Sequence, residues 1–134
     1  MRFQFALAAL LAMMTNDALA SDWQAVDRSE KGMVYVEVES ISRSDDLVRT
    51  WVKWNYKEPQ VNRQGQKYLS ERQRVVFRCD SQQYMITSFT EFPELDFQGN
   101  AVRSGNLTDE WGDAPPDTIA MSILEFVCKH APSK

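Results

Sequence analysis

The sequence contains few of the residues that most catalytic sites require. It has one histidine, His130, together with two cysteines and five glycines. The histidine lies in a predicted C-terminal tail, where no rigid element would hold it against a serine or cysteine nucleophile. There is no glycine-rich phosphate loop and no Cys/His cluster suited to zinc. We therefore expect no enzyme activity, no metal site and no cofactor.

Long hydrophobic runs are also missing, except at the start of the chain. Arg2 precedes an apolar run over residues 3–14, and Ala18-Leu19-Ala20 is typical of a signal-peptidase cleavage site. Residues 1–20 are therefore predicted to be a cleavable signal peptide and residues 21–134 one exported domain. No cysteine follows the run to carry a lipid anchor, and no later segment is apolar enough for a membrane span. We expect the protein in the periplasm or on the outer cell surface.

Positive charge is not in excess. Fifteen Lys and Arg residues stand against nineteen Asp and Glu residues, which gives a net charge of -4. The predicted signal peptide contains one residue of each sign, Arg2 and Asp17, so its removal leaves this value unchanged. An acidic protein is a poor candidate for general nucleic-acid binding, and we expect no nucleic-acid partner.

The two cysteines fit an exported protein. Cys79 ends a stretch in which Val75 and Phe77 alternate with arginines, and this period of two predicts a strand with one buried face. Cys128 lies near the end of the last helical segment. Because the exported compartment is oxidising, we predict a Cys79–Cys128 disulfide rather than a redox-active pair, which usually has the C-x-x-C spacing.

Alternating hydrophobic residues predict a series of strands. The connections between them are too short for a parallel crossover, so the sheet should be antiparallel. Residues 57–66, which include Pro59 and Gly65, are predicted to form a polar loop, and residues 105–113 a second loop. The predicted strands cover residues 23–26, 33–38, 47–56, 67–79 and 83–92, with a weak edge strand at 99–104.

A helix is predicted after Pro115-Pro116, with Asp117 as its N-cap. Its apolar residues recur with helical spacing and form one broad stripe that should cover one face of the sheet. The stripe consists of Ile119, Ala120, Ile123, Leu124, Val127 and Cys128. The predicted fold is therefore α+β: an antiparallel meander of about six strands with one C-terminal helix packed on a face and tied to the sheet by the disulfide.

Charge is segregated along the chain. Residues 43–78 contain nine basic and four acidic residues, whereas residues 79–117 contain one basic and eight acidic residues. If strands 47–56 and 67–79 are neighbours, six side chains share the outer sheet face: Arg49, Trp51, Lys53, Arg72, Arg74 and Arg78. Such a face could bind an acidic protein, a glycosaminoglycan or lipopolysaccharide phosphates. The alternative is ordinary sheet surface, neutralised by Glu37, Glu39 or Glu71.

The outward direction of Trp51 has two explanations. The strand period points it away from the predicted helix, whereas Trp23, Trp54 and Trp111 are more typical of core or lid residues. An outward tryptophan can contact a ligand, or it can be covered by a second copy of the chain in a homodimer. The sequence leaves both open.

Taken together, several motifs resemble the surface-adhesin protein E family over essentially the whole chain after residue 20. The motifs are Trp23, Trp51-Val52 within residues 48–56, Lys67-Tyr68-Leu69-Ser70, Val76-Phe77-Arg78-Cys79-Asp80, Glu110-Trp111 followed by Pro115-Pro116, and Phe126-Val127-Cys128. The resemblance implies a small exported domain of Gram-negative bacteria with an antiparallel sheet and a packed helix. The namesake of the family binds host extracellular-matrix proteins.

We therefore expect an exported, non-catalytic binding or adhesion module whose partner is a host matrix protein or an acidic envelope component. The alternative is a periplasmic envelope protein with an assembly, inhibitory or stress role and no adhesin activity. The absence of a lipid-anchor cysteine favours this alternative.

Overall fold

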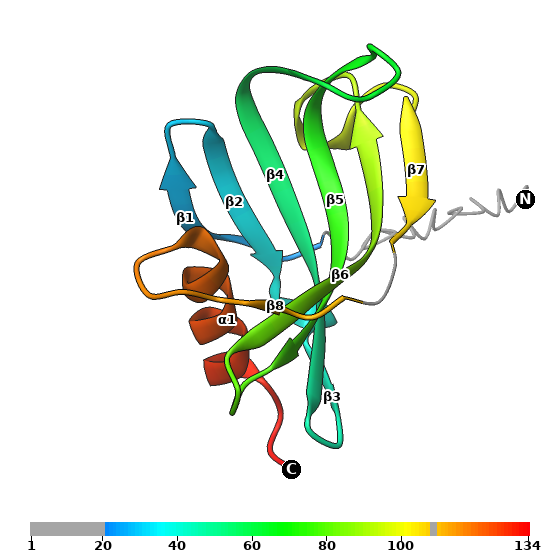
Figure 1. Ribbon diagram of the computed structural model, residues 1–134. Helices are drawn as coiled ribbons and strands as arrows, with labels where there is room; N and C mark the ends of the chain where they lie inside the picture. The colour runs from blue at the N-terminus through cyan, green and yellow to red at the C-terminus, as the bar shows by residue number, and fades with distance from the viewer. Residues whose placement is uncertain (1–20, 108–109) are drawn as a thin grey trace, which may run out of the picture.

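The computed structural model describes residues 21–107 and 110–134, and within them the chain forms one antiparallel sheet with a helix at its C-terminal end (Figure 1). The predicted signal peptide, residues 1–20, lies outside the described residues. The sheet order is β1-β2-β4-β5-β6-β7, with β3 paired to β4 and β8 paired to β6. The predicted α+β meander and its C-terminal helix are confirmed.

The strands follow the predicted order with some changes at their ends. Five long strands form most of the sheet: β1 (Trp23–Ser29), β2 (Gly32–Glu37), β4 (Leu47–Val61), β5 (Lys67–Arg78) and β6 (Gln83–Phe92). Short elements complete the fold: 3-10 turns η1 (Val38–Ser40) and η2 (Leu95–Phe97), and strands β3 (Ser42–Ser44), β7 (Arg103–Asn106) and β8 (Gly112–Asp113). The helix is α1 (Ile119–His130).

Strand β4 is longer than predicted, so the prediction of a loop from residue 57 onward is wrong. The register of β4 against β5 shifts between Asn55 and Gln60, and Pro59 lies inside this irregular stretch. Proline has no backbone N–H to donate, but at this position no regular hydrogen bond between β4 and β5 is lost. The turn itself is confined to residues 62–66, where the Gly65 N–H donates to the Asn62 carbonyl at 3.0 Å.

Several other element boundaries differ from the sequence prediction. The edge strand lies at residues 103–106 instead of 99–104, and β8 forms inside the predicted second loop. The N-cap of α1 is Thr118, whose hydroxyl accepts from the Met121 N–H at 3.2 Å, whereas Asp117 has a φ of 61°. An N-cap needs extended backbone, which Thr118 has and Asp117 does not. His130, predicted in a tail, ends the helix.

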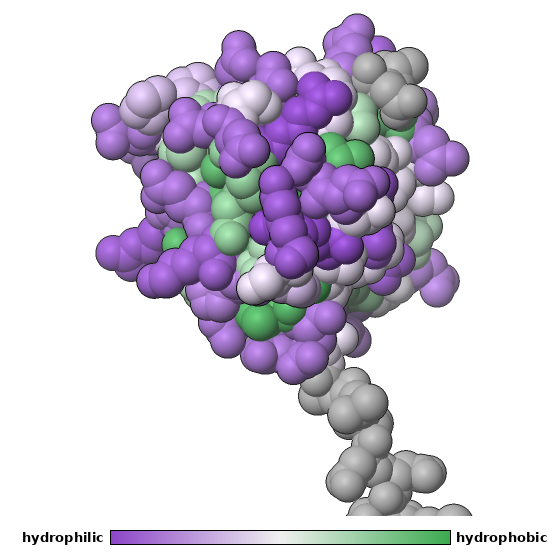
Figure 2. Space-filling view, turned by 90° about the horizontal axis from the view of Figure 1, so that it is seen from below, coloured by the Kyte–Doolittle hydropathy of each residue, from purple (hydrophilic) through white to green (hydrophobic). Residues whose placement is uncertain are grey.

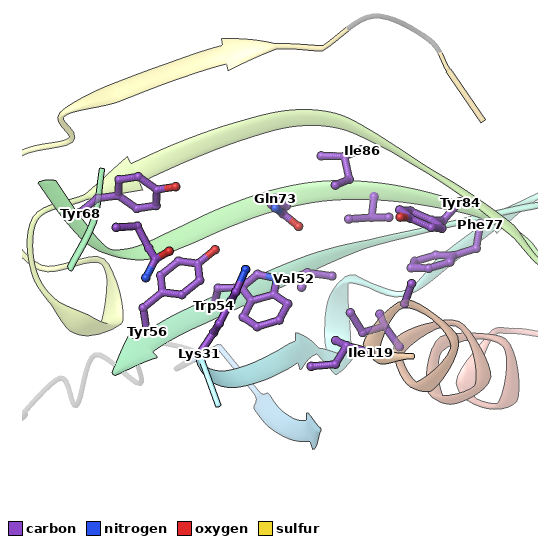
Figure 3. Close-up of a pocket in the computed structure, with 14 residues that line it drawn as sticks. Lys31, Val52, Trp54, Tyr56, Tyr68, Gln73, Phe77, Tyr84, Ile86 and Ile119 are labelled. Atoms are coloured by element: carbon purple, nitrogen blue, oxygen red, sulfur yellow. The ribbon is translucent and has the colours of Figure 1, made fainter. Parts of the chain in front are cut away.

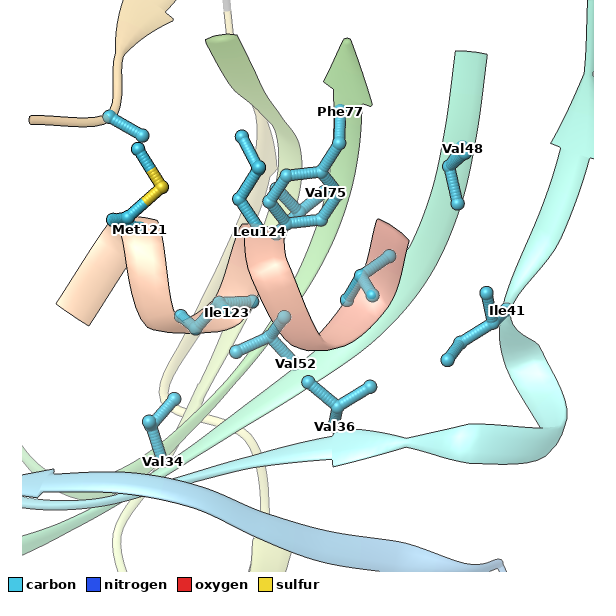
Figure 4. Packing of buried hydrophobic residues seen from close by; sticks show 12 residues of the cluster. Val34, Val36, Ile41, Val48, Val52, Val75, Phe77, Met121, Ile123 and Leu124 are labelled. Atoms are coloured by element: carbon cyan, nitrogen blue, oxygen red, sulfur yellow. The ribbon is translucent and has the colours of Figure 1, made fainter. Parts of the chain in front are cut away.

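The core lies between α1 and one face of the sheet, which we call the inner face (Figure 4). The cross-strand pairs Val36↔Val52 and Val48↔Phe77 point to the inner face and so identify which side of β2, β4 and β5 contributes to the core. The predicted stripe of α1 packs against these residues, with Met121 added to it. Seen from below, most of the surface is hydrophilic and the apolar residues form small separate groups (Figure 2).

The predicted disulfide is confirmed. Cys79 follows β5 and Cys128 lies in the last turns of α1, and their Cα atoms are 5.9 Å apart. This distance is within the range that a disulfide spans without backbone distortion. The bond therefore joins the C-terminal half of the helix to the sheet. Among the described residues, no helix has the length and hydrophobicity that crossing a bilayer requires.

Candidate functional site

The six predicted site residues lie on the outer face, the side of the sheet opposite α1. Strands β4 and β5 pair Trp51 with Arg74 and Lys53 with Arg72, so these four side chains are direct cross-strand neighbours. Arg49 and Arg78 follow on the same face, opposite Val76 and Leu47 respectively. The register therefore brings together the set that the strand period predicts.

Residues 93–98 are predicted from the sequence to be irregular, and the structure shows that this segment covers part of the outer face. Residues 93–99, the 93–99 loop, fold back onto β4 and β5. The Ser70 hydroxyl donates to the Glu94 carbonyl at 2.6 Å and accepts from the Phe97 N–H at 3.0 Å. The Asn55 side chain donates to Asp96 Oδ1 at 2.8 Å and accepts from the Asp96 N–H at 3.0 Å. These bonds hold the loop in one position.

The backbone of the 93–99 loop is strained. Asp96 and Phe97 have φ angles of 53° and 62°, in the left-handed region that costs a residue with a side chain about 1–2 kcal/mol each. Gly99 has a φ of 83°, and a Cβ there would lie 2.7 Å from Pro93 Cγ. The contacts with Ser70 and Asn55 therefore stabilise a conformation that the loop would not adopt alone.

Lys53 lies under the 93–99 loop and is only 8% exposed. Its Nζ donates to Asp96 Oδ1 at 2.9 Å. The same atom lies 4.6 Å from the ring centre of Tyr35, 5.1 Å from that of Trp23 and 5.7 Å from that of Phe97. Hydrogen bonds from Asn55 and Lys53 hold the pKa of Asp96 below its usual value. Lys53 therefore has its ionic partner within the chain.

Arg72 is half-buried beside Lys53. Its guanidinium carbon lies 5.4 Å from the Trp51 ring, 5.7 Å from Phe92 and 5.6 Å from Phe97. Its buried Nε makes no hydrogen bond with any described residue. The aromatic rings therefore supply most of the contacts that hold this cation.

The remaining predicted residues form, together with Trp111, what we call the basic–aromatic face, in which Arg78 is exposed and the others are half-buried. Its members are Arg49, Trp51, Arg74, Arg78 and Trp111. The Arg74 guanidinium lies 4.9 Å from the Trp51 ring, and that of Arg78 lies 3.8 Å from the Trp111 ring. Each arginine carries a permanent positive charge at physiological pH. The stacked rings restrict the guanidiniums, so less rotamer freedom is lost when they contact a partner.

Charge neutralisation applies to part of the predicted face, because Lys53 pairs with Asp96 and Glu37 lines the same outer-face hollow as Trp51 and Arg72. Glu71 precedes Arg72 on β5, and neighbouring residues of a strand point to opposite faces. Its side chain therefore lies on the inner face, away from the arginines. The ion pairs found within residues 21–107 and 110–134 are Lys53–Asp96 and Lys134–Asp46, and neither involves the basic–aromatic face. Nor do these residues contain a group of three or more His, Cys, Asp or Glu arranged to hold a metal.

A groove on the inner face is a second candidate site, and the sequence reasoning missed it. It has a volume of about 460 Å³ and lies where α1 leaves the sheet uncovered (Figure 3). Tyr56 and Tyr68 lie at one end, Phe77 and Ile86 lie toward the other, and Gln73 lies between them. The groove therefore has a polar aromatic end and an apolar end.

Two of the residues that line the polar end, Tyr56 and Gln73, hydrogen-bond to a carboxylate next to the groove that is not part of an ion pair. Glu71 Oε2 accepts from the Tyr56 hydroxyl at 3.2 Å, and Glu71 Oε1 accepts from Gln73 Nε2 at 2.9 Å. Burial raises the pKa of Glu71 because the charged form loses hydration. Burial and the nearby Glu71 carboxylate raise the pKa of Tyr56, which therefore stays protonated and able to donate.

Comparisons with known proteins agree on one family. Residues 23–129 match the model of the family described as surface-adhesin protein E. Two solved structures of Haemophilus influenzae protein E, one of them from a non-typeable strain, resemble the chain at 17% and 16% identity with TM-scores of 0.59 and 0.62. Each covers 82% of this chain, and the matches include 86% and 77% of those chains. No curated protein matches the sequence.

Proposed function

Because the chain belongs to the surface-adhesin protein E family, we propose that it is an exported, non-catalytic adhesion module that binds an acidic partner through the basic–aromatic face. One observation carries the proposal: the guanidiniums of Arg74 and Arg78 lie over Trp51 and Trp111 and have no carboxylate partner among the described residues. Charges that the fold itself leaves uncompensated are available to a partner.

The chemistry of this face favours an anionic ligand with some apolar surface. Guanidinium groups donate bidentate hydrogen bonds to carboxylates and sulfates, and the tryptophan rings offer flat contact area beside them. Tryptophan and arginine are also the side chains that most often dominate binding energy in protein interfaces. The ligand class is an acidic segment of an extracellular-matrix protein or an acidic polysaccharide attached to one.

Charge segregation supports the same proposal. The chain as a whole is acidic, yet the segment that carries Arg49, Arg74 and Arg78 is basic. An acidic polymer is therefore attracted to one face and repelled elsewhere, which orients it on approach. Such association weakens as salt screens the charges.

Charge reversal on this face is expected to abolish most of the binding. The variant Arg49→Glu/Arg74→Glu/Arg78→Glu should bind immobilised heparin, used as the acidic probe, at least about tenfold more weakly than wild type in surface plasmon resonance, because three attractive contacts become repulsive. The wild-type affinity should also fall when salt is raised.

A matched variant controls for total charge. Lys57→Glu/Arg63→Glu/Lys67→Glu makes the same charge change at exposed positions around the β4–β5 turn, away from the basic–aromatic face. It should retain most of the heparin binding. Equal loss in both variants would mean that only net charge matters, and unchanged binding in the first variant would remove this face as the site. Circular dichroism of each variant verifies that the fold is intact.

A further inference from the structure

The inner-face groove exists because the helix is too short for the sheet. Twelve helical residues extend about 18 Å, whereas the fifteen residues of β4 extend about 50 Å. The described chain places no second helix over the remaining part of the inner face. The floor and walls there consist of side chains from β4, β5, β6 and the first turns of α1.

The polar end of the groove presents flat aromatic surface. Trp54 and Tyr56 are stacked with their ring centres 5.6 Å apart and their planes within 8° of each other. Tyr68 meets Tyr56 edge to face at 5.8 Å. Figure 3 shows the three rings at the same end of the groove, with the tyrosine hydroxyls directed into it. Rings of this kind pack well against the C–H face of a sugar ring.

The same end offers both hydrogen-bond donors and acceptors. The Gln73 amide nitrogen donates to Glu71, and the Gln73 carbonyl oxygen remains available as an acceptor in the groove. The Tyr68 hydroxyl makes no side-chain hydrogen bond with another described residue. A ligand that is apolar throughout would remove water from these groups without replacing its hydrogen bonds, which is costly.

Both acidic and basic side chains lie around the polar end of the groove. Glu71 is the cross-strand neighbour of Glu91, which in turn pairs with Arg103 on β7. Burial raises the pKa of Glu71, and the positive charge of Arg103 only partly opposes this effect. Lys31 lines the groove near Trp54. A cationic or an anionic head group would therefore be repelled by a like charge as well as attracted by an opposite one. An uncharged head group avoids this repulsion.

The other end of the groove has different chemistry. Half-buried Ile86, Ile119 and Ala120 line it above the buried side chains of Phe77 and Val75. It offers no charged group among its lining residues. This end fits a hydrocarbon chain, whose burial is favourable in proportion to the apolar area removed from water.

From these two ends we propose that the groove binds an amphiphile with an uncharged saccharide head and a single alkyl or acyl chain, as in a simple glycolipid. The sugar ring packs against Trp54 and the tyrosines, its hydroxyls exchange hydrogen bonds with Gln73 and Tyr68, and the chain lies between Ile86 and Ile119. This site is on the face opposite the basic–aromatic face and is independent of it.

The test uses n-octyl β-D-glucoside below its micellar concentration as the probe. In ¹H–¹⁵N NMR titrations, the indole N–H signal of Trp54 should shift with a dissociation constant of about 1 mM or lower, while that of Trp51 on the outer face should not move. Methyl β-D-glucoside, which lacks the chain, and octyl sulfate, which replaces the sugar by an anion, should each bind at least about tenfold more weakly.

A variant separates head recognition from chain recognition. Tyr68→Phe removes one hydroxyl that makes no internal side-chain hydrogen bond, so the fold should be unaffected. It should weaken octyl glucoside binding about three- to tenfold and leave octyl sulfate binding unchanged. The triple arginine variant of the outer face should bind octyl glucoside like wild type. Equal affinity for octyl sulfate, or no shift of Trp54 with any probe, would overturn the proposal.

Discussion

Replacing both cysteines with serine, as Cys79→Ser/Cys128→Ser, is expected to lower the free energy of unfolding by about 4 kcal/mol. The bond closes a segment with a sequence separation of 49, and the chain-entropy treatment gives about this value for such a loop. This is a large share of the 5–15 kcal/mol that typically separates folded from unfolded domains. For a chain of this size the melting temperature should fall by about 15 °C.

The physical reason lies in how α1 is attached. Between β7 and α1, the residues that the structure describes contain little regular structure besides the two-residue strand β8, so the disulfide is the covalent restraint that keeps the helix near the sheet. Thermal unfolding followed by circular dichroism measures the effect, and a reducing agent should destabilise wild type but not the double variant. Equal melting temperatures for wild type with and without reductant would contradict the expectation.

Lys53→Glu is expected to destabilise the protein by about 3–5 kcal/mol. The substitution places a carboxylate where only 8% of the residue is exposed, beside the Asp96 carboxylate. It also points negative charge at the faces of Tyr35, Trp23 and Phe97, which carry partial negative charge themselves. The 93–99 loop would lose its strongest contact, and its strained backbone would relax away from the sheet.

Two variants isolate the cause of this effect, measured by denaturant unfolding. Arg49→Glu makes the same charge reversal on the same face of the same strand, at a half-buried position that makes no ion pair with a described residue, and should change stability by no more than about 0.5 kcal/mol. Lys53→Met keeps the apolar stem of the lysine without burying an anion, and should cost less than Lys53→Glu. If Lys53→Glu is tolerated as well as Arg49→Glu, the ammonium is not enclosed as described.

Strand period was the most informative signal in the sequence. A residue's position along a strand decides which face it occupies, so the co-location of Trp51, Arg72 and Arg74 followed once two neighbouring strands were recognised. The apolar stripe of α1 and the pairing of two cysteines were equally local inferences. Each depends on a spacing that can be read directly from the chain.

The burial of Lys53 could not be read in this way. It results from a loop some forty residues further along, whose position depends on hydrogen bonds from Ser70 and Asn55 and on two left-handed residues without glycine. Asp96 is a residue type that tolerates the left-handed region, but the large side chain of Phe97 gives no such signal. Long-range contacts of this kind have no periodic signature.

The inner-face groove did leave a signal. Tyr56, Tyr68, Glu71 and Gln73 are more polar than a sheet face fully covered by a helix allows, and the predicted helix is visibly shorter than the predicted strands. Comparing these two lengths indicates an uncovered stretch. Which side chains converge there still depends on the extension of β4 past Pro59, which the sequence prediction placed in a loop.

Protease accessibility on intact Gram-negative cells tests the adhesion account most directly, because an adhesin has to be reachable from outside. A tag placed after Lys134 would be followed with and without permeabilisation of the outer membrane. The account predicts digestion on intact cells. Protection until the outer membrane is permeabilised would contradict it and favour a periplasmic envelope role instead.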